Sequence, residues 1–461
     1  MAMPQQASDL VMLAIAMKDV YSAAAVYEIA SGLQKLALES LMFGERRNAL
    51  MLARWEHTPA SVLMALTSLS DSAINLRLQK NQSASGAVLS KLYAGAKNAS
   101  LIKLIAQHRH TPQSVLEEIA ELEQAPDVLK VVCSNPNTSE AVFRVIAKEV
   151  PGKFDSEMVS NPAIPEDVLE TIYGRSNSNL RAAVVSHKHC SISLLEQATT
   201  ESDNTIIRHL AANPSMTSHF LNMASQSKDA AVRRAAASNP TLPKELVRSL
   251  MRDQMVAVRR TVASRADLQT DDIEVLAEDK DHWVRQWIAR NPVTPKRLLK
   301  MLAKEKNADV RRAVARNPSC PSQLLENLAE DTNAWVRSAV AYQPKTAMHV
   351  LKKLSEGKDI DVLSGVAANP RTPQSILQKL VKAEDADVRR GVILNPRANR
   401  KSLKPLLQDP YFLHRLLLVS HPALTAKDKW GLHNDPDPSV RFTALSWFAK
   451  KIMRNEQVIA I

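Results

Sequence analysis

The chain has 461 residues and a net charge of +12, and 45% of its residues are hydrophobic while only 4% are aromatic. Its core must therefore be built from Ala, Val, Leu and Ile, which favours many short helices over sheets. No run of 18 apolar residues occurs, and a basic start with a small-residue cleavage site is missing, so we expect neither a membrane span nor a signal peptide.

The positive charge is concentrated in one part of the chain. Residues 211–400 hold 32 Lys and Arg against 21 Asp and Glu, so that +11 of the net +12 lies there. The three cysteines, Cys133, Cys190 and Cys320, are far apart and lack the paired spacing of a metal or redox site. We therefore expect a reducing, cytoplasmic location.

The first predicted element is a helical cap over residues 1–45. Its apolar run, residues 10–30, is interrupted by Lys18, Asp19 and Glu28, and it does not match the repeat that follows.

From residue 46 to residue 447 the chain repeats with a period of about 26 residues. The frame starts at Trp55, Asn81 and His108, and His187, Arg265, Gln343 and His421 later occupy steps at which an Asn-Pro pair is replaced. A period kept for so long indicates about fifteen tandem units. The Asn-Pro pairs themselves begin at Asn135, Asn161, Asn213, Asn239, Asn291, Asn317, Asn369 and Asn395.

Residues 281–306 show how one unit should fold. Asp281 is a good N-cap for a short helix, which ends at Asn291 because a residue before proline is pushed out of the α region. Thr294 should cap a second helix that has Pro295 in its first turn and leucines on its buried side. The Asn of each Asn-Pro pair should tie down the backbone of the turn between the helices.

Helices this short are not stable alone, so neighbouring units must stack. The predicted fold is an all-α solenoid of two-helix repeats, closed by atypical ends that cover the exposed apolar stripes. The expected domains are an N-terminal helical cap (1–45), one solenoid (46–447) and a C-terminal tail (448–461).

Two segments, Trp-Val-Arg-Gln-Trp-Ile-Ala-Arg-Asn-Pro (283–292) and Asp-Val-Arg-Arg-Ala-Val-Ala-Arg-Asn-Pro (309–318), resemble the leucine-rich repeat variant (LRV) family of bacterial proteins. The likeness extends over about 49–447. It implies a right-handed superhelix in which an α-helix alternates with a 3₁₀-helix or a short second helix. The founding member's cysteine cluster, which binds iron and sulfur, has no counterpart here, so we expect no cofactor. The chain is also similar to HEAT repeats, whose Asp-x-x-Val-Arg signature recurs at 281–285, 385–389 and 437–441.

One arginine per repeat forms the most regular charged column. In several units an Asp stands four residues earlier (Asp229, Asp281, Asp385 and Asp437), which is the favourable order for a helical ion pair. We therefore predict a structural ladder that links stacked repeats. The column consists of Arg233, Arg259, Arg285, Arg311, Arg337, Arg389, Arg415 and Arg441.

A second basic column follows the ladder directly and has no regular acidic partners. Trp283 and Trp335 project on the same side, while Trp287 should belong to the core. A stripe of Arg and Trp suits an acidic peptide or the phosphates and bases of a nucleic acid, although it could also be a solvated surface. The candidate binding residues are Arg208, Arg234, Arg260, Trp283, Arg290, Arg312, Arg316, Trp335 and Arg390, and Lys130 lies in the same column.

Other reactive residues have simpler explanations. Cys133 occupies a column otherwise filled by Ala, so it should be a small buried residue. The pairs His108/His110 and His187/His189 lie in turns without a recurring third ligand, so we predict no metal site. No phosphate loop, dinucleotide fingerprint, zinc-protease motif or Gly-x-Ser-x-Gly elbow occurs, so we predict no catalytic residues.

These features favour a non-catalytic scaffold that binds a protein partner on an extended surface with a basic stripe, and we expect no membrane contact and no small-molecule substrate. Nucleic-acid binding is the alternative. It includes, less favourably, an alkylpurine DNA glycosylase, because HEAT-like solenoids include such enzymes. An enzyme with its site in the cap before residue 45 is a third possibility that rests only on the unmatched sequence there.

Overall fold

The computed structural model describes residues 3–4, 6–96, 98–122 and 125–454. In these residues the chain forms 34 α-helices and four short 3₁₀-helices, and no strand. None of the described helices is long and apolar enough to cross a bilayer. The chain divides into two compact units, of which the first is Met1–Leu210 together with Trp430–Ile461 and the second is Ala211–Lys429. The prediction of an all-α fold made of helical repeats is confirmed.

The first unit begins with three helices, α1 (Ala7–Met17), α2 (Val20–Val26, continued by η1, Tyr27–Ile29) and α3 (Gly32–Phe43). It ends with η4 (Gly431–Asn434) and α34 (Pro438–Met453). Between them, each repeat has a first and a second helix. The first helices are α4 (Arg46–Arg54), α6 (Ser72–Lys80), α8 (Ala99–Gln107), α10 (Pro126–Ser134), α12 (Asp155–Val159), α14 (Ser178–Val185) and α16 (Asn204–Ala212). The second helices are α5 (Ala60–Leu66, continued by η2, Thr67–Leu69), α7 (Gly86–Ala94), α9 (Gln113–Leu122), α11 (Glu140–Glu149), α13 (Glu166–Arg175) and α15 (Ile192–Ala198).

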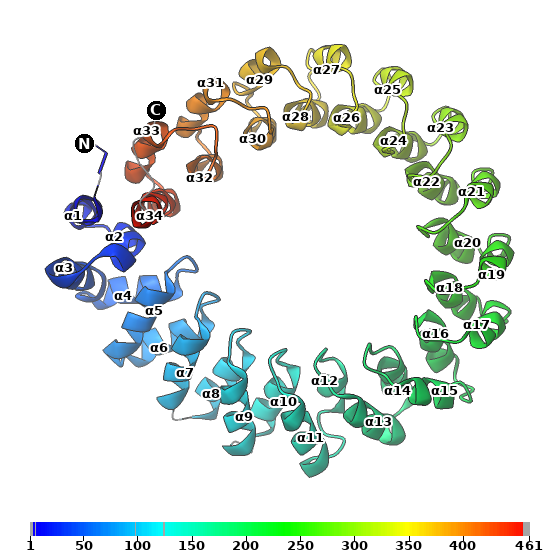
Figure 1. The fold of residues 1–461 in the computed structure, drawn as a ribbon, viewed down its shortest axis with the longest axis horizontal. Helices are drawn as coiled ribbons and strands as arrows, with labels where there is room; N and C mark the ends of the chain where they lie inside the picture. The colour runs from blue at the N-terminus through cyan, green and yellow to red at the C-terminus, as the bar shows by residue number, and fades with distance from the viewer. Residues whose placement is uncertain (1–2, 5, 97, 123–124, 455–461) are drawn as a thin grey trace. The chain divides into compact units, whose positions relative to one another are not determined.

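The second unit repeats the same pair of helices, and Figure 1 shows its first helices on the inner side of a curve and its second helices on the outer side. The first helices are α18 (Ala230–Ser238), α20 (Val256–Ala263), α22 (His282–Arg290), α24 (Ala308–Arg316), α26 (Ala334–Tyr342), α28 (Ile360–Ala368), α30 (Ala386–Leu394) and α32 (Phe412–Val419). The second helices are α17 (Ser218–Ser225), α19 (Lys244–Leu250), α21 (Thr270–Leu276), α23 (Lys296–Leu302), α25 (Ser322–Leu328), α27 (Met348–Leu354), α29 (Gln374–Leu380), α31 (Arg400–Leu403, continued by η3, Lys404–Gln408) and α33 (Ala426–Trp430).

The helix α22 begins and ends where the sequence predicts. The Asp281 carboxylate accepts from the amides of Trp283 and Val284, and Asn291 leaves the helical conformation before its proline. Thr294 does not cap the second helix, because its hydroxyl donates back to the carbonyl oxygen of Ile288 and Pro295 takes the N-cap position. The second elements of most repeats are α-helices, so the 3₁₀-helix that the family resemblance allowed is confined to the ends of a few of them.

The Asn of the Asn-Pro turn does more than hold its own turn. The Oδ1 of Asn317 accepts from the amide of Ser319, which confirms the predicted role. Its Nδ2 also donates to the carbonyl oxygens of Ala289 (2.7 Å) and Asn291 (2.8 Å) in the preceding repeat. Buried backbone carbonyls at a helix end need such donors, so this side chain ties each repeat to the one before it. Equivalent bonds are made by Asn81, Asn135, Asn161, Asn239, Asn369 and Asn395.

Other residue types make the same link where the Asn is replaced. Gln343 donates through Nε2 to two carbonyl oxygens of the preceding repeat, and Arg265 does so through one guanidinium nitrogen. His108 donates through Nε2 to the carbonyl oxygen of Asn81, while its Nδ1 accepts from the amide of His110. The replacements therefore preserve the hydrogen bond and change only the group that makes it. For His108 this requires the neutral ring with its proton on Nε2.

The arginine ladder exists, but its acidic partner is not the predicted one. Arg311 pairs through Nε and Nη2 with Asp331, 20 residues later, at 2.7 and 2.9 Å, and its Nη1 donates to the carbonyl oxygen of Glu305. Asp281, which stands four residues before Arg285, caps its helix instead. A carboxylate that follows the second helix of the same repeat accepts two parallel hydrogen bonds from the guanidinium, and the bond to Glu305 connects the arginine to the preceding repeat. The same spacing joins Arg233 to Asp253, Arg259 to Asp279, Arg285 to Glu305 and Arg389 to Asp409.

The last arginine of this column pairs with the beginning of the chain. Arg441 on α34 contacts Asp19, the N-cap residue of α2, at 3.2 Å. The Trp55 ring lies edge-on between Tyr21 and Phe442, with ring centroids 4.6 and 4.7 Å away. Helices α1 and α2 therefore pack on α34 within the first unit, and Asp19 takes the place of the acid that stands 20 residues after the arginine in other repeats.

The ladder is incomplete at Arg337, because Gly357 stands where its carboxylate should be, and the nearest acid, Asp359, is 3.9 Å away. A Cβ at Gly357 would make only an ordinary contact, 3.4 Å from the carbonyl oxygen of Leu354. We expect Gly357→Asp to raise the free energy of unfolding by about 1 kcal/mol more than Gly357→Ala does. Urea unfolding followed by circular dichroism measures both. An equal gain in the two variants, or the same extra gain in an Arg337→Gln background, would contradict the assignment.

The histidines that replace Asn should make stability depend on pH. Burial, above all, lowers the pKa values of His108, His187 and His421 below the usual 6.5. The unfolded chain therefore binds more protons once the pH falls below about 6.5, and the free energy of unfolding falls until the folded-state pKa values are passed. Replacing all three by Asn should flatten this decrease in a series of thermal unfolding curves between about pH 7 and 5. An unchanged slope would show that these rings do not titrate on unfolding.

Candidate functional site

The exposed side of the first helices in the second unit carries most of the predicted binding residues. In α22 this side consists of Trp283, Gln286, Trp287 and Arg290, whereas Val284 and Ile288 on the opposite side are buried. The buried side faces the second helices, so the exposed side faces the inside of the curve in Figure 1. We call it the concave face, and it comprises the second, fifth, sixth and ninth residues after the N-cap of each first helix from α18 to α32. The sixth residue is a small buried alanine in α18, α24 and α26.

The tryptophans of the concave face are accessible. Trp283 is 45% exposed and Trp335 is 58% exposed, as the sequence predicts. The prediction that Trp287 is a core residue is wrong, because this side chain is 40% exposed. Its position, four residues after Trp283, places both rings on one side of α22, and the core stripe is filled by Val284 and Ile288.

Arg260 is the exception among the predicted basic residues, because it has an acidic partner. Its guanidinium donates two hydrogen bonds to the Asp281 carboxylate, at 2.8 and 2.6 Å. Its Cζ lies 5.8 Å from the Trp283 ring centroid. The interaction with Arg260 lowers the pKa of the Asp281 carboxyl to about 2. Arg260 therefore joins α20 to the N-cap of α22, and its charge is largely compensated. Lys130, in the same column of the first unit, also has a partner, Glu157, at 3.1 Å.

Arg290, Arg312 and Arg316 have no such partner. They form no ion pair within the described part of the chain, and Arg312 lies with its Cζ 5.0 Å from the Trp335 ring centroid. Arg290 lies in the same way 5.5 Å from the Trp287 ring centroid. Burial first, and then the positive charges of Arg312 and Arg290, lower the pKa of Arg316. Arg316 is thus close enough to Arg290 and to Arg312 to be affected by their charge, and none of the three has an acidic partner among the described residues.

The remaining predicted residues are exposed but isolated. Arg234 on α18 and Arg390 on α30 lie on the concave face, with no hydrogen-bond or ion-pair partner within the described ranges. Arg208 is also exposed, but α16 places it in the first unit. The structure therefore brings together Arg290, Arg312 and Arg316 with the tryptophans, and it leaves the other arginines apart from that cluster.

The concave face also exposes apolar side chains that sequence reasoning missed. Tyr342 is 49% exposed and Leu394 is 56% exposed, and Leu413 and Leu417 on α32 continue the same side. A signal was present, because these residues occupy the same positions after the N-cap as Trp283, Trp287 and Arg290. Single exposed apolar residues need no explanation, but a row of them along one face is typical of a binding surface.

Two glycines bring the helices of this face close together. A Cβ at Gly365 would lie 2.7 Å from the Cβ of Ala341, and one at Gly391 would lie 2.8 Å from the Cβ of Ala367. Only glycine permits this approach of α28 to α26 and of α30 to α28. The exposed side chains of these three helices are therefore closely spaced.

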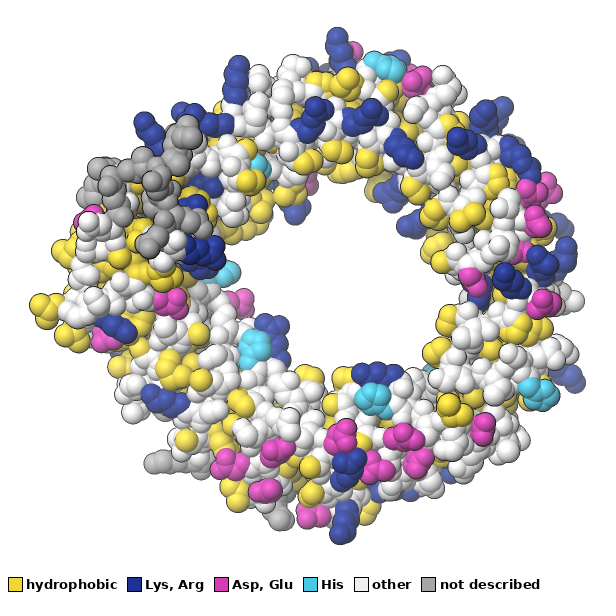
Figure 2. Space-filling view, in the orientation of Figure 1, with side chains coloured by type: hydrophobic (Ala, Val, Ile, Leu, Met, Phe, Trp, Pro, Cys, Tyr) yellow, Lys and Arg dark blue, Asp and Glu magenta, His cyan; other side chains and the backbone are white. Residues whose placement is uncertain are grey.

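Acidic residues modulate the charge of the concave face. Asp309, Asp361 and Asp387 hold the same position in α24, α28 and α30. The pKa of Tyr342 is raised by burial and, to a smaller extent, by the charges of Asp361 and Asp387. Figure 2 shows Lys and Arg gathered over the second unit and apolar side chains along its inner rim. The face is thus most basic around α22 and α24 and more apolar toward α32.

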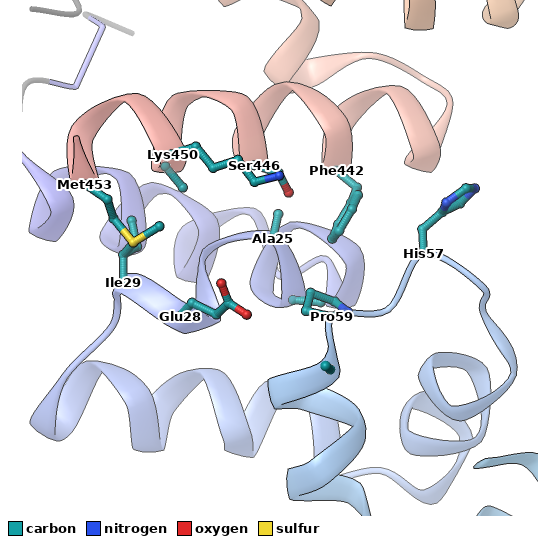
Figure 3. Close-up of a pocket in the computed structure, with 12 residues that line it drawn as sticks. Ala25, Glu28, Ile29, His57, Pro59, Phe442, Ser446, Lys450 and Met453 are labelled. Atoms are coloured by element: carbon teal, nitrogen blue, oxygen red, sulfur yellow. The ribbon is translucent and has the colours of Figure 1, made fainter. Parts of the chain in front are cut away.

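Figure 3 shows a different opening, which lies in the first unit between α2 and α34. Its volume is about 280 Å³, and Ile29, Phe442 and Met453 give it an apolar lining. Glu28 and Lys450 face it from opposite helices, and Glu28 accepts a hydrogen bond from Ser61. None of the predicted binding residues lines it.

The cysteine thiols are buried or half-buried, and the histidine rings of the turns are hydrogen-bonded to the backbone. Burial raises the pKa of the Cys133, Cys190 and Cys320 thiols to about 12. The ring of His110 bonds to the carbonyl oxygen of Ala84, and that of His189 bonds to the carbonyl oxygen of Ile164. Among the described residues, no three His, Cys, Asp or Glu side chains gather in a group that could hold a metal ion.

Comparison with known proteins places one repeat in a family. Residues 308–332, which contain α24 and α25, match the leucine rich repeat variant model, so the resemblance is confirmed for this repeat. No curated protein matches the chain.

Two solved structures are similar over most of this chain. Importin beta, crystallised in an ammonium sulfate condition, has 11% identity over 98% of this chain and 64% of its own length, with a TM-score of 0.29. Kap95p, in a structure with RanGDP, has 12% identity over 95% of this chain and 60% of its own, with a TM-score of 0.24. The chain thus spans less than two thirds of either protein, and neither likeness bears on what it binds.

Arg311 and Arg312 are neighbours in sequence with different roles, which gives a matched test. Arg311→Gln should lower the free energy of unfolding by about 2–4 kcal/mol, because it leaves the largely buried Asp331 carboxylate unpaired. Arg312→Gln should change the free energy of unfolding by less than about 0.5 kcal/mol, because Arg312 contacts only the exposed ring of Trp335. Equal losses in urea unfolding would show that the ladder and the concave face are not distinct.

Proposed function

We propose that the chain is a non-catalytic binding scaffold and that the concave face of its second unit binds a protein partner through an extended acidic segment that also carries apolar side chains. The observation that carries this proposal is the mixture on one face of exposed tryptophans, unpaired arginines and exposed leucines over consecutive helices. The three free cysteines fit a reducing, cytoplasmic compartment.

The residue types of the concave face support an interface with a protein. Trp, Tyr and Arg dominate the energetics of protein interfaces because each combines a large apolar area with a polar group. Trp283, Trp287 and Trp335 offer such area before any partner binds, and Arg290 and Arg312 lie against two of these rings. A partner would therefore meet side chains that are already held in place, so it loses less entropy on binding.

Three features favour a protein over a nucleic acid. The exposed side chains of Leu394, Leu413 and Leu417 cannot hydrogen-bond to a phosphate backbone, but they can pack against apolar side chains of a peptide. Asp309, Asp361 and Asp387 interrupt the positive charge along the face, and a continuous polyanion would be repelled there. The compensation of Arg260 by Asp281 further shortens the basic stretch.

Selection from a displayed library of random peptides tests the proposal. Peptides selected on the full chain should be enriched in Asp and Glu together with Leu or aromatic residues. They should bind the Trp283→Ser/Trp335→Ser variant about tenfold or more weakly. The control is Val293→Ser/Met348→Ser, which removes two exposed apolar side chains of the same unit that lie off the concave face.

The same proteins should be titrated with labelled single- and double-stranded DNA over a salt series. Each neutralised phosphate steepens the salt dependence on duplex DNA by about 0.9. Tight DNA binding with a steep slope, together with no enrichment of acidic peptides, would overturn the proposal in favour of nucleic acid. Equal loss of peptide binding in both double variants would show that the concave face is not the site.

A further inference from the structure

Within the concave face, the geometry points to a binding site for a phosphate monoester at Arg290, Arg312 and Arg316, occupied by a phosphorylated side chain of the protein partner. This inference rests on the proposed function, because it names the chemistry by which that face recognises its partner. Three observations support it, namely the placement of the three guanidinium groups, their lack of counter-charges and the unused hydrogen-bonding atoms beside them.

The three arginines come from two neighbouring helices and lie on one side of both. Arg290 and Arg316 are each the ninth residue after the N-cap of their helix, α22 and α24, and these two helices pack side by side. Arg312 precedes Arg316 by one turn on the same side. Burial lowers the pKa of the Arg316 guanidinium most, and the charges of Arg312 and Arg290 lower it further, as their placement on the same side of neighbouring helices requires.

Every other arginine on these two helices is already paired. Arg285 pairs with Glu305, and Arg311 pairs with Asp331. Three guanidinium groups held together without a counter-charge are unfavourable in the free protein, and an anion that binds among them removes this repulsion. A phosphate monoester carries nearly two negative charges near pH 7 and three acceptor oxygens, whereas a carboxylate carries one charge and two oxygens. The excess of positive charge therefore favours phosphate over carboxylate.

The aromatic rings hold the guanidinium groups in place. Trp287 lies under Arg290 and Trp335 lies under Arg312, so the N–H groups at the edges of the guanidinium planes stay free for an acceptor. Planar guanidinium groups bind phosphate oxygens through two parallel bonds, which lysine cannot do. All three cations of the cluster are arginines, which suits a site that binds phosphate through paired hydrogen bonds.

Two buried polar atoms beside the cluster point to a peptide rather than a free ion. The Nε of Arg312 has no acceptor, and the Oε1 of Gln286 has no donor. Gln286 and Arg312 are each the fifth residue after the N-cap of their helix, so they occupy corresponding places on α22 and α24. A phosphate dianion only accepts hydrogen bonds, so a ligand that satisfies both atoms must also carry a donor, such as the backbone N–H of a peptide. Because both atoms are buried, the side chains of Gln286 and Arg312 must rotate to meet it.

Asp309 explains why a single phosphate suits the site better than a chain of them. It lies on the same side of α24 as Arg312 and is three residues before it. A phosphate that extended the ligand beyond Arg312 in this direction would meet a carboxylate of the same charge sign. The site therefore fits one dianion at a defined place along an otherwise uncharged or mixed segment.

The test uses the full chain and an oriented peptide library with random flanks and a fixed central residue. The centre is phosphoserine, phosphothreonine, serine or glutamate. We expect the phosphorylated members to bind about tenfold or more tightly than the glutamate members. The variant Arg290→Gln/Arg312→Gln/Arg316→Gln should lose this preference. The control Lys280→Gln/Lys306→Gln/Lys358→Gln should keep it, because it removes the same charge from exposed residues just before the N-caps of α22, α24 and α28.

The outcomes separate this inference from the proposed function. Equal binding of the phosphoserine and glutamate members, with both lost in the Trp283→Ser/Trp335→Ser variant, would overturn the phosphate site and leave the acidic-peptide surface standing. No binding of any member would overturn both. Competition by inorganic phosphate as strong as by the phosphopeptide would assign the site to the free ion and overturn the peptide. Unchanged helical circular dichroism of both triple variants would verify that they are folded.

Discussion

The fold depends on one hydrogen-bonding arrangement, in which a side chain at the turn of most repeats bonds to one or two backbone carbonyl groups of the repeat before it. Asn317 makes this link to Ala289 and Asn291, and Asn, Gln and Arg make it at other steps with the same pair of acceptors. Each first helix ends after about nine residues at a turn whose carbonyls are buried, so without this donor every repeat would leave unpaired polar groups in its core. The stacking of the repeats and the termination of the helices therefore share a single cause.

The arginine ladder adds a second connection on the opposite end of the same helices. Its members join the end of the preceding second helix, through the carbonyl oxygens they contact, to a carboxylate that follows the second helix of their own repeat. The two sets of bonds hold the first helices in register and leave one side of them uninvolved. That side is the concave face. Apart from Arg260, its large side chains make none of these bonds, so Trp, Arg and Leu can be exposed there while the period of 26 residues is kept.

Much of this could be predicted from the sequence, and the errors have physical reasons. Asp281 and Asn291 gave the limits of α22, because capping and the effect of proline are local. The partner of Arg285 was missed, because a helical i, i+4 pair with Asp281 was preferred to Glu305, 20 residues away. The column Asp253, Asp279, Glu305, Asp331 and Asp409 was nevertheless visible at the repeat spacing. Trp287 was assigned to the inward side of its helix, although Val284 and Ile288 already filled the buried stripe. The cluster of Arg290, Arg312 and Arg316 requires knowing which arginines are paired, and this depends on contacts between repeats.

The packing of α1 and α2 on α34 has a consequence for how the protein is made. Asp19 and Arg441 are 422 residues apart, yet they belong to the same packed unit. At roughly 5–20 residues per second, a ribosome needs roughly 20–80 s to add the partner of the N-terminal helices after those helices have been synthesised. During that time α2 lacks the surface of α34 that packs against it in the finished fold. The beginning of this chain must therefore remain soluble, or be kept so by a chaperone, until its end has been translated.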